Sequence, residues 1–210
     1  MPQQLTTPAT KSDARHYGPW LHHTPADAAA LLGGYKGRWW IAGGWAIEAF
    51  TGVAREHSDI DPSIPRSEAP WLREYLLGRL DVWAADSGTL SPVVEPGAMI
   101  ASTCSNLWLR PSGADPWEYD VVLMDVDAER WTYKRDPRIS LPLTEILWHL
   151  DGIPSLRPEI QLLHKAPGLR PQDQQDFENS QPLLDDTARR WLRTALTTAH
   201  PGHPWLAELT

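Results

Sequence analysis

The pattern of hydrophobic and polar positions is clearest in residues 39–66. A short apolar run, residues 39–42, is long enough to form one buried strand. Gly43 and Gly44 follow, and residues 45–50 then place apolar side chains at the spacing of the first turns of a helix. The pattern therefore predicts a strand that turns into a helix at two glycines.

Two glycines at such a turn suit a ligand-binding role. Backbone without side chains can approach a ligand closely, and the N-terminus of a helix offers N–H groups to an anion such as a phosphate. A plain strand-to-helix turn is the alternative interpretation of Gly43 and Gly44.

An acidic pair follows the glycine turn. Asp59 and Asp61 fall on the next predicted strand, where residues two apart point to the same side, so both carboxylates project together and Ile60 faces the other way. Two like charges repel, so their placement side by side needs an explanation. A hard divalent cation such as Mg²⁺, which also binds phosphate oxygens, would explain it. Because Pro62 cannot donate to a central ladder, we expect this strand to end here or to lie near a sheet edge.

The third acid is expected on a hairpin formed by residues 106–110 and 117–125, which are separated by a Pro- and Gly-containing turn. Asp120 lies inside the apolar run of the second strand, and a buried carboxylate needs a partner or a metal. Asp120 is therefore the predicted third acid. Glu118, which shares its face, and a purely structural role for Asp120 are the alternatives.

Further helices are predicted from capping residues and apolar stripes. Thr24 caps a helix over residues 25–32, and Ser67 caps one that runs to about Leu80. Another is expected over residues 141–152. The packed face of the Ser67 helix is expected to carry Trp71, Leu72, Tyr75, Leu76 and Leu80.

These motifs resemble the nucleotidyltransferase superfamily with a DNA polymerase β-like fold. Gly-Gly-Trp-Ala-Ile, Arg-Glu-His and Asp-Ile-Asp, in this order, resemble its antibiotic-modifying branch, the aminoglycoside 2''-nucleotidyltransferases and lincosamide nucleotidyltransferases. The resemblance implies an α+β (mixed α/β) fold, in which a small mixed β-sheet flanked by helices is followed by a helical C-terminal part. It also implies that Asp59 and Asp61 are catalytic Mg²⁺ ligands and that Gly43 and Gly44 lie near the triphosphate of ATP or another nucleoside triphosphate.

The same resemblance extends to residues 158–165, the segment that ends at Lys165. Lys165 is expected to neutralise the triphosphate or the pyrophosphate leaving group, or else to be a surface lysine at the end of a helix. Arg55 is expected either to reach the phosphates or to fix the loop ahead of the aspartates. Asp120 is expected to bind metal and to act as general base toward the acceptor hydroxyl.

Length, composition and charge limit the classes of partner that this chain is expected to bind. The chain has 210 residues, a net charge of −8 and no cluster of Lys and Arg, so a small cationic substrate fits better than nucleic acid. One cysteine, Cys104, excludes an intrachain disulfide and is compatible with a reducing cytoplasm. No apolar run approaches the roughly 20 residues of a membrane span, and no signal peptide is recognisable. The expected location is cytoplasmic.

We expect three parts: a flexible tail at residues 1–17, a nucleotidyltransferase core at 18–140, and a helical part at 141–210 packed on the core. The expected activity is Mg²⁺-dependent transfer of a nucleoside monophosphate from ATP, or another nucleoside triphosphate, to a hydroxyl of a small aminoglycoside- or lincosamide-like molecule, releasing pyrophosphate. The alternatives are a non-catalytic nucleotide-binding or antitoxin-like member of the fold, and a nucleotidyltransferase acting on a protein or RNA. The sequence carries no signal for the oligomeric state.

Overall fold

The computed structural model describes residues 17–209. The expected N-terminal tail, residues 1–17, lies almost entirely outside this part of the chain. No helix within the described residues combines the length and the hydrophobicity that crossing a bilayer requires.

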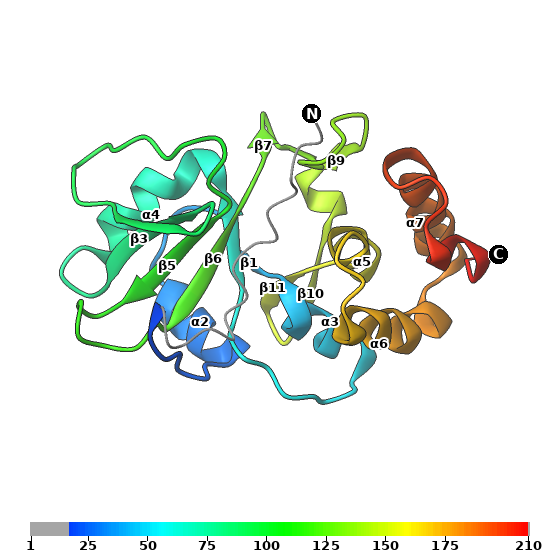
Figure 1. The fold of residues 1–210 in the computed structure, drawn as a ribbon, viewed down its shortest axis with the longest axis horizontal. Coiled ribbons are helices and arrows are strands. Elements are labelled where there is room, and N and C mark those ends of the chain that lie inside the picture. Colours follow the sequence, from blue (N-terminus) through cyan, green and yellow to red (C-terminus); the bar gives the residue numbers. More distant parts are fainter. Residues whose placement is uncertain (1–16, 210) are drawn as a thin grey trace. The chain divides into compact units, whose positions relative to one another are not determined.

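The chain divides into two compact units that interleave along the sequence (Figure 1). In the described part, unit 1 consists of residues 17–39 and 57–124. Unit 2 consists of residues 40–56 and 125–209. The sequential division at residue 140 stays a prediction.

Unit 1 is built on a mixed sheet in the strand order β2-β6-β5-β3-β4. β2 runs parallel to β6, whereas the β6–β5, β5–β3 and β3–β4 pairs are antiparallel. The hairpin predicted from the sequence is confirmed, since β5 and β6 pair with Trp108 opposite Asp120. The strands are β2 (Pro62–Pro65), β3 (Asp81–Asp86), β4 (Thr89–Pro92), β5 (Asn106–Arg110) and β6 (Tyr119–Met124).

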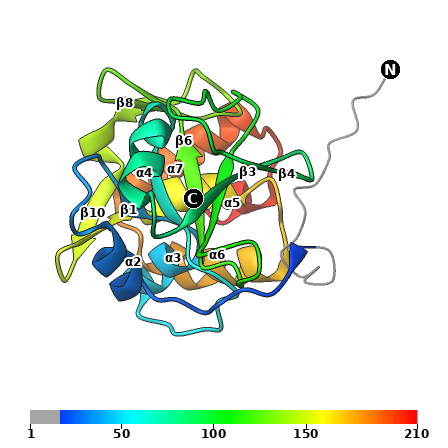
Figure 2. The same cartoon turned by 90° about the vertical axis from the view of Figure 1, so that its left-hand side faces the viewer.

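The helices of unit 1 are α2 (Pro25–Leu32) and α4 (Ala69–Leu76), which follows the short 3-10 helix η1 (Arg66–Glu68). The Thr24 side chain caps α2, as predicted, by accepting a hydrogen bond from the backbone N–H of Asp27. α4 packs on β3 (Figure 2) and buries Ala69, Leu72 and Leu76.

Three expectations for this unit are wrong in detail. Ser67 lies inside η1 and does not cap α4, which begins at Ala69 and ends at Leu76 rather than near Leu80. Trp71 is 61% exposed, so it does not belong to the packed face of α4, whose buried positions lie on a neighbouring stripe. The strand near the aspartates begins, rather than ends, at Pro62. A proline is tolerated at the first position of a strand because its missing N–H is not needed there.

Unit 2 contains strands in the order β10-β11-β1 and a second small sheet in the order β7-β8-β9. β1 pairs with β11 in parallel, and β10 pairs with β11 in antiparallel orientation. The strands are β1 (Trp40–Ile41), β7 (Val126–Asp127), β8 (Arg130–Thr132), β9 (Ser140–Pro142), β10 (Leu147–Leu150) and β11 (Ile153–Leu156).

The helix expected over residues 141–152 is wrong. Only the 3-10 turn η2 (Leu143–Glu145) of this segment is helical, and β10 and β11 form a hairpin across Asp151 and Gly152. Both turn residues have positive φ, 51° and 79°. Such Asp-Gly turns match the twist of a two-residue hairpin, and this local chemistry decided between helix and strand.

The helices of unit 2 form most of its C-terminal part. α5 packs against α3, α6 and α7 (Figure 1), and the rings of Phe177 and Trp205 stack 4.3 Å apart in the core. The predicted mixed α/β fold with a helical C-terminal region is confirmed. The helices are α3 (Gly43–Thr51), α5 (Pro158–Lys165), α6 (Pro171–Ser180) and α7 (Asp186–Ala199), with 3-10 turns η3 (Gln181–Leu183) and η4 (Pro204–Ala207).

Candidate active site

Three carboxylates of unit 1 meet in one cluster. Asp59, Asp61 and Asp120 each offer one oxygen, and these oxygens all lie within 4.8 Å of one another. Asp120 is 3% exposed, and the other two side chains are partly buried. The structure thus brings together the three acids that the sequence selected, in an all-oxygen set of the kind that Mg²⁺ prefers.

The backbone explains how two distant segments reach the same place. The N–H of Asp120 donates to the carbonyl of Ile60 at 3.2 Å, so the segment carrying Asp59 and Asp61 runs beside β6 before β2 begins. Ile60 is fully buried. The acids flank this residue, and the alternation expected of extended backbone is kept although the segment is not itself a strand.

Neutral side chains hold two of the carboxylates. The Asn106 amide donates from Nδ2 to Oδ1 of Asp120 at 2.8 Å, and the Ser58 hydroxyl donates to Oδ1 of Asp59 at 3.0 Å. Sequence reasoning missed Asn106. The signal was the predicted hairpin, but naming this residue requires the strand register, which pairs Asn106 with Val122, diagonal to Asp120.

Glu118, the sequence alternative for the third acid, is not a member of the cluster. Its Oε2 lies 3.5 Å from Nε2 of His23, whose ring stacks on Tyr119 with 4.7 Å between centroids. Burial raises the pKa of Tyr119 to about 12, and the charge of Glu118 adds to this rise. Asp120 is therefore the acid of β6 that the geometry joins to Asp59 and Asp61.

The glycine turn lies in unit 2, where β1 leads into α3. Gly43 has φ = 69°, a conformation that favours glycine, and it begins α3 as predicted. The Gly43 N–H donates to Oε1 of Gln161 on α5 at 2.8 Å, and Ala42 at the N-cap forms no side-chain cap. Gly44 is buried in the first turn of the helix.

Lys165 is 7% exposed, which contradicts the surface-lysine alternative. Its Nζ lies 3.1 Å from Oδ1 of Asp173 and 2.8 Å from Oδ2 of Asp176, both on α6. Burial alone would raise the pKa of Asp173, but the hydrogen bond from Arg170 and the charge of Lys165 outweigh it and hold that pKa below its usual value.

Arg55 belongs to the same network of unit 2. Its Nε donates to Oδ1 of Asp176 at 3.1 Å, and its backbone N–H donates to Oε2 of Glu48 at 3.1 Å. These contacts support the interpretation in which Arg55 fixes the loop ahead of the aspartates. A phosphate-binding role for Arg55 and Lys165 stays a prediction.

Comparisons with known proteins agree with this fold. The family model of aminoglycoside-2''-adenylyltransferase matches residues 26–81, a stretch that contains the glycine turn and the first two acids. The lincomycin-bound crystal structure of the lincosamide antibiotic adenylyltransferase LnuA is 18% identical, covers 76% of this chain and 95% of its own, and superposes with a TM-score of 0.50. No curated protein sequence matches the chain.

Two structures of the antibiotic-resistance factor ANT(2'')-Ia are also similar. The solution structure is 19% identical, with 81% of this chain and 88% of its own covered and a TM-score of 0.48. The crystal structure with adenylyl-2''-tobramycin is 18% identical, with 80% and 92% covered and a TM-score of 0.43. The resemblance predicted from the sequence is confirmed, and the chain has the nucleotidyltransferase fold that LnuA displays.

Proposed function

We propose that this protein is a Mg²⁺-dependent nucleotidyltransferase that transfers a nucleoside monophosphate from ATP, or another nucleoside triphosphate, to a hydroxyl of a small molecule and releases pyrophosphate. The observation that carries the proposal is the approach of Asp59, Asp61 and Asp120, whose ligand oxygens lie within 4.8 Å of one another. Catalysts of phosphoryl and nucleotidyl transfer need such a carboxylate set for their metal ions.

The electrostatics of the cluster favour a divalent cation. Two unit charges at the separation of these oxygens repel by roughly 3 kcal/mol at an effective dielectric constant of about 20, and three carboxylates give three such pairs. The hydrogen bonds from Ser58 and Asn106 orient the acids without changing the net charge. Asp59, Asp61 and Asp120 would therefore hold Mg²⁺, which when bound neutralises phosphate charge and aligns nucleophile and leaving group.

The chain's own residues would prepare the acceptor hydroxyl for attack. The hydroxyl oxygen bonds to the α-phosphorus, the bond from that phosphorus to the pyrophosphate oxygen breaks, and the hydroxyl proton passes to the carboxylate of Asp120. The Asn106 amide, which donates to Oδ1 of Asp120, would hold this carboxylate in place for the proton transfer.

The acceptor that we propose is an aminoglycoside- or lincosamide-like antibiotic. The family model that matches residues 26–81 is that of an aminoglycoside-2''-adenylyltransferase, and LnuA is a lincosamide adenylyltransferase. The chain carries a net charge of −8, which suits the amino groups of such acceptors. ATP is the proposed donor because both names describe adenylyl transfer.

The test is pyrophosphate release from ATP and Mg²⁺ across a panel of aminoglycosides and lincosamides, with Asp59→Asn as the control variant. We expect release that depends on one acceptor class and is lost in the variant. Mass spectrometry of the acceptor should show the added nucleoside monophosphate. Acceptor-independent release that Asp59→Asn retains would contradict the proposal, because it would arise outside the acidic cluster.

A further inference from the structure

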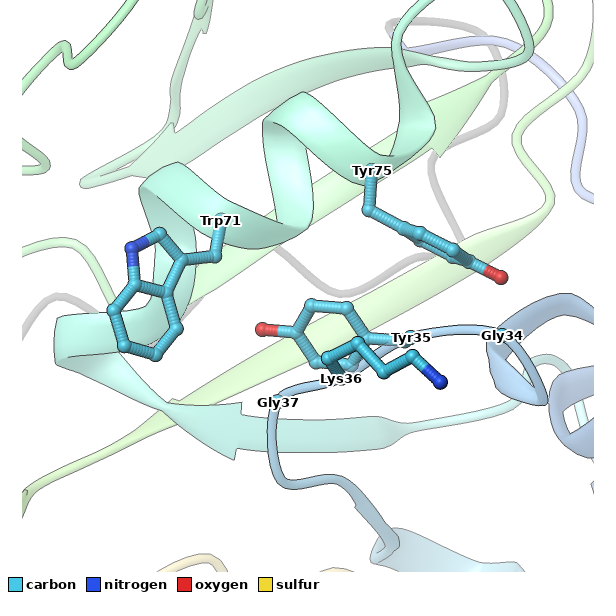
Figure 3. A pocket seen from close by; sticks show the side chains of 6 residues that line it. All are labelled: Gly34, Tyr35, Lys36, Gly37, Trp71 and Tyr75. Atoms are coloured by element: carbon cyan, nitrogen blue, oxygen red, sulfur yellow. The ribbon is translucent and has the colours of Figure 1, made fainter.

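Unit 1 has a cavity between the loop that follows α2 and the outer side of α4. None of the residues that line it belongs to the acidic cluster. The cavity has a volume of about 360 Å³ and is lined by Gly34, Tyr35, Lys36, Gly37, Trp71 and Tyr75. Figure 3 shows the Tyr35 ring between Trp71 and Tyr75, with the Lys36 side chain alongside it. Volumes of this size begin to accommodate small organic ligands.

The aromatic walls are fixed in place. Tyr75 donates its hydroxyl to the carbonyl of Leu31 at 2.8 Å, and Tyr35 donates to Oε2 of Glu68 at 3.3 Å. Burial, and then the charge of Glu68, raise the pKa of Tyr35, so its hydroxyl stays protonated and remains a donor. The walls therefore need little ordering when a ligand enters.

The glycines of the loop let the backbone approach these rings. A Cβ on Gly37 would lie 2.3 Å from Oε2 of Glu68 and 2.4 Å from the Tyr35 ring, which leaves no room for a side chain. A Cβ on Gly34 would lie 3.1 Å from the hydroxyl of Tyr75. The shape of the cavity thus depends on the residues that line it.

Trp71 is unusual among the aromatic residues that line the cavity because of its exposure. It is 61% exposed, whereas Ala69, Leu72 and Leu76 of the same helix are buried, and it is one turn from Tyr75 on the same side of α4. Large exposed aromatic side chains grouped at a concave surface are characteristic of binding sites.

The charged residues around the cavity indicate the charge of its ligand. Lys36 is exposed and, within residues 17–209, forms no hydrogen bond or ion pair. The nearby carboxylate of Glu68 is already neutralised by Arg38, whose Nε lies 2.7 Å from Oε1. The guanidinium of Arg79 covers the Tyr75 ring at 4.3 Å and adds a second positive charge to this surface.

From these observations we propose that the cavity formed by Tyr35, Lys36, Trp71 and Tyr75 binds a small planar aromatic carboxylate. The ring stacks among the three aromatic side chains, and the carboxylate pairs with the Lys36 ammonium. Binding at this site needs neither nucleotide nor metal. The proposal can therefore be tested independently of the proposed transferase activity.

The test is a calorimetric titration of the full chain with 2-naphthoate, and in parallel with 2-naphthamide, which has the same shape without the charge. We expect saturable binding of 2-naphthoate that is at least about threefold tighter than that of the amide, as for a partly exposed ion pair. Lys36→Gln should remove this preference, and Trp71→Ala should weaken 2-naphthoate binding about tenfold. Both side chains are exposed, so these variants should fold.

Lys134→Gln is the matched control, because it removes the same charge from an exposed lysine of unit 2. It should leave 2-naphthoate binding unchanged. Equal affinity for acid and amide, an equal loss in Lys36→Gln and Lys134→Gln, or no saturable binding would overturn the proposal. So would concentration-dependent self-association in the ultracentrifuge that Trp71→Ala abolishes without 2-naphthoate binding, since the cavity would then serve a second copy of the chain.

Discussion

Each of the two units contains a cluster of carboxylates, but the side chains that surround the two clusters differ in charge. In unit 2, Asp173 and Asp176 are each 1% exposed and pair with Lys165, which lies between them. Arg55 and Arg170 complete this network. Buried charges of opposite sign are thus placed side by side.

In unit 1, Asp59, Asp61 and Asp120 bring like charges within 4.8 Å. The Ser58 hydroxyl and the Asn106 amide hold two of them without adding positive charge. Removing one partner from the ion pairs of unit 2 leaves a buried charge uncompensated, whereas three carboxylates brought together form a ligand set suited to a metal ion. The comparison therefore predicts opposite consequences when a carboxylate is removed from each unit.

The largest effect is expected for the unit 1 cluster. Asp120→Asn should lower the rate of acceptor-dependent pyrophosphate release about 10³-fold, because both metal ligation and proton transfer are lost. The free energy of unfolding, measured with urea, should stay the same or rise, since one of three repelling charges is gone.

Asp81→Asn, at an exposed position of unit 1, is the matched control and should change neither quantity. If Asp120→Asn instead unfolds the protein by several kcal/mol, Asp120 is a structural carboxylate, and the contrast between the units disappears.

The unit 2 network should respond in stability. Lys165→Met leaves Asp173 and Asp176 buried with less positive charge, and breaking a buried pair in this way costs about 3–5 kcal/mol. Urea unfolding measures this loss. Asp186→Asn removes one partner of an exposed pair with Arg189, whose atoms lie 3.4 Å apart, and should cost less than about 1 kcal/mol.

The opposite result would redefine the network. If Lys165→Met is as stable as the parent protein but has a greatly raised KM for ATP, then Lys165 binds phosphate. Its contacts with the two aspartates would then be secondary.

What the sequence predicted well depends on neighbouring residues. The strand that turns into a helix at Gly43 and the hairpin that carries Asp120 both follow from short patterns of apolar residues and turn residues. The three acids can be predicted because a carboxylate in apolar or alternating surroundings needs a partner or a metal ion. The approach of all three in space agrees with this prediction.

What the sequence did not predict depends on tertiary partners or on competing local signals. The segment ending at Gly152 has apolar residues that fit a helix, yet the Asp-Gly turn made it a hairpin. The sequence does not decide between two roles for Lys165, because its partners on α6 are not visible in a linear pattern. Asn106 became visible only through the register of β5 against β6.

A partly buried histidine of unit 2 extends the comparison to pH. His164 is enclosed by Trp131 and Tyr133, with ring centroids 5.7 and 5.3 Å away, and burial, aided by the charge of Arg135, lowers its pKa from 6.5 to about 4. Between these two values the unfolded chain binds more protons than the folded one. The free energy of unfolding should therefore fall by roughly 3 kcal/mol as the pH decreases from 6.5 to 4.

Urea unfolding of the parent protein and of His164→Gln across this pH window measures the effect. The variant should have a flatter dependence on pH, whereas His149→Gln, at an exposed position, should follow the parent protein. Parallel curves for the parent protein and His164→Gln would show that another group controls acid stability.

The smallest effect is expected for Asn106, and it tests a single hydrogen bond within the unit 1 cluster. Asn106→Leu replaces the donor to Oδ1 of Asp120 with a side chain of the same branching but no hydrogen-bonding group, and one hydrogen bond to a charged group accounts for about a tenfold loss of rate. Because the amide positions the acid and does not bind nucleotide, kcat should fall while KM for ATP stays constant and the Mg²⁺ concentration for half-maximal rate rises. Asn106→Asp, which adds a like charge beside Asp120, should reduce the rate further. Equal rates in Asn106→Leu and the parent protein would mean that the backbone of β6 alone orients Asp120, and that the neutral donors of unit 1 do not contribute to its difference from unit 2.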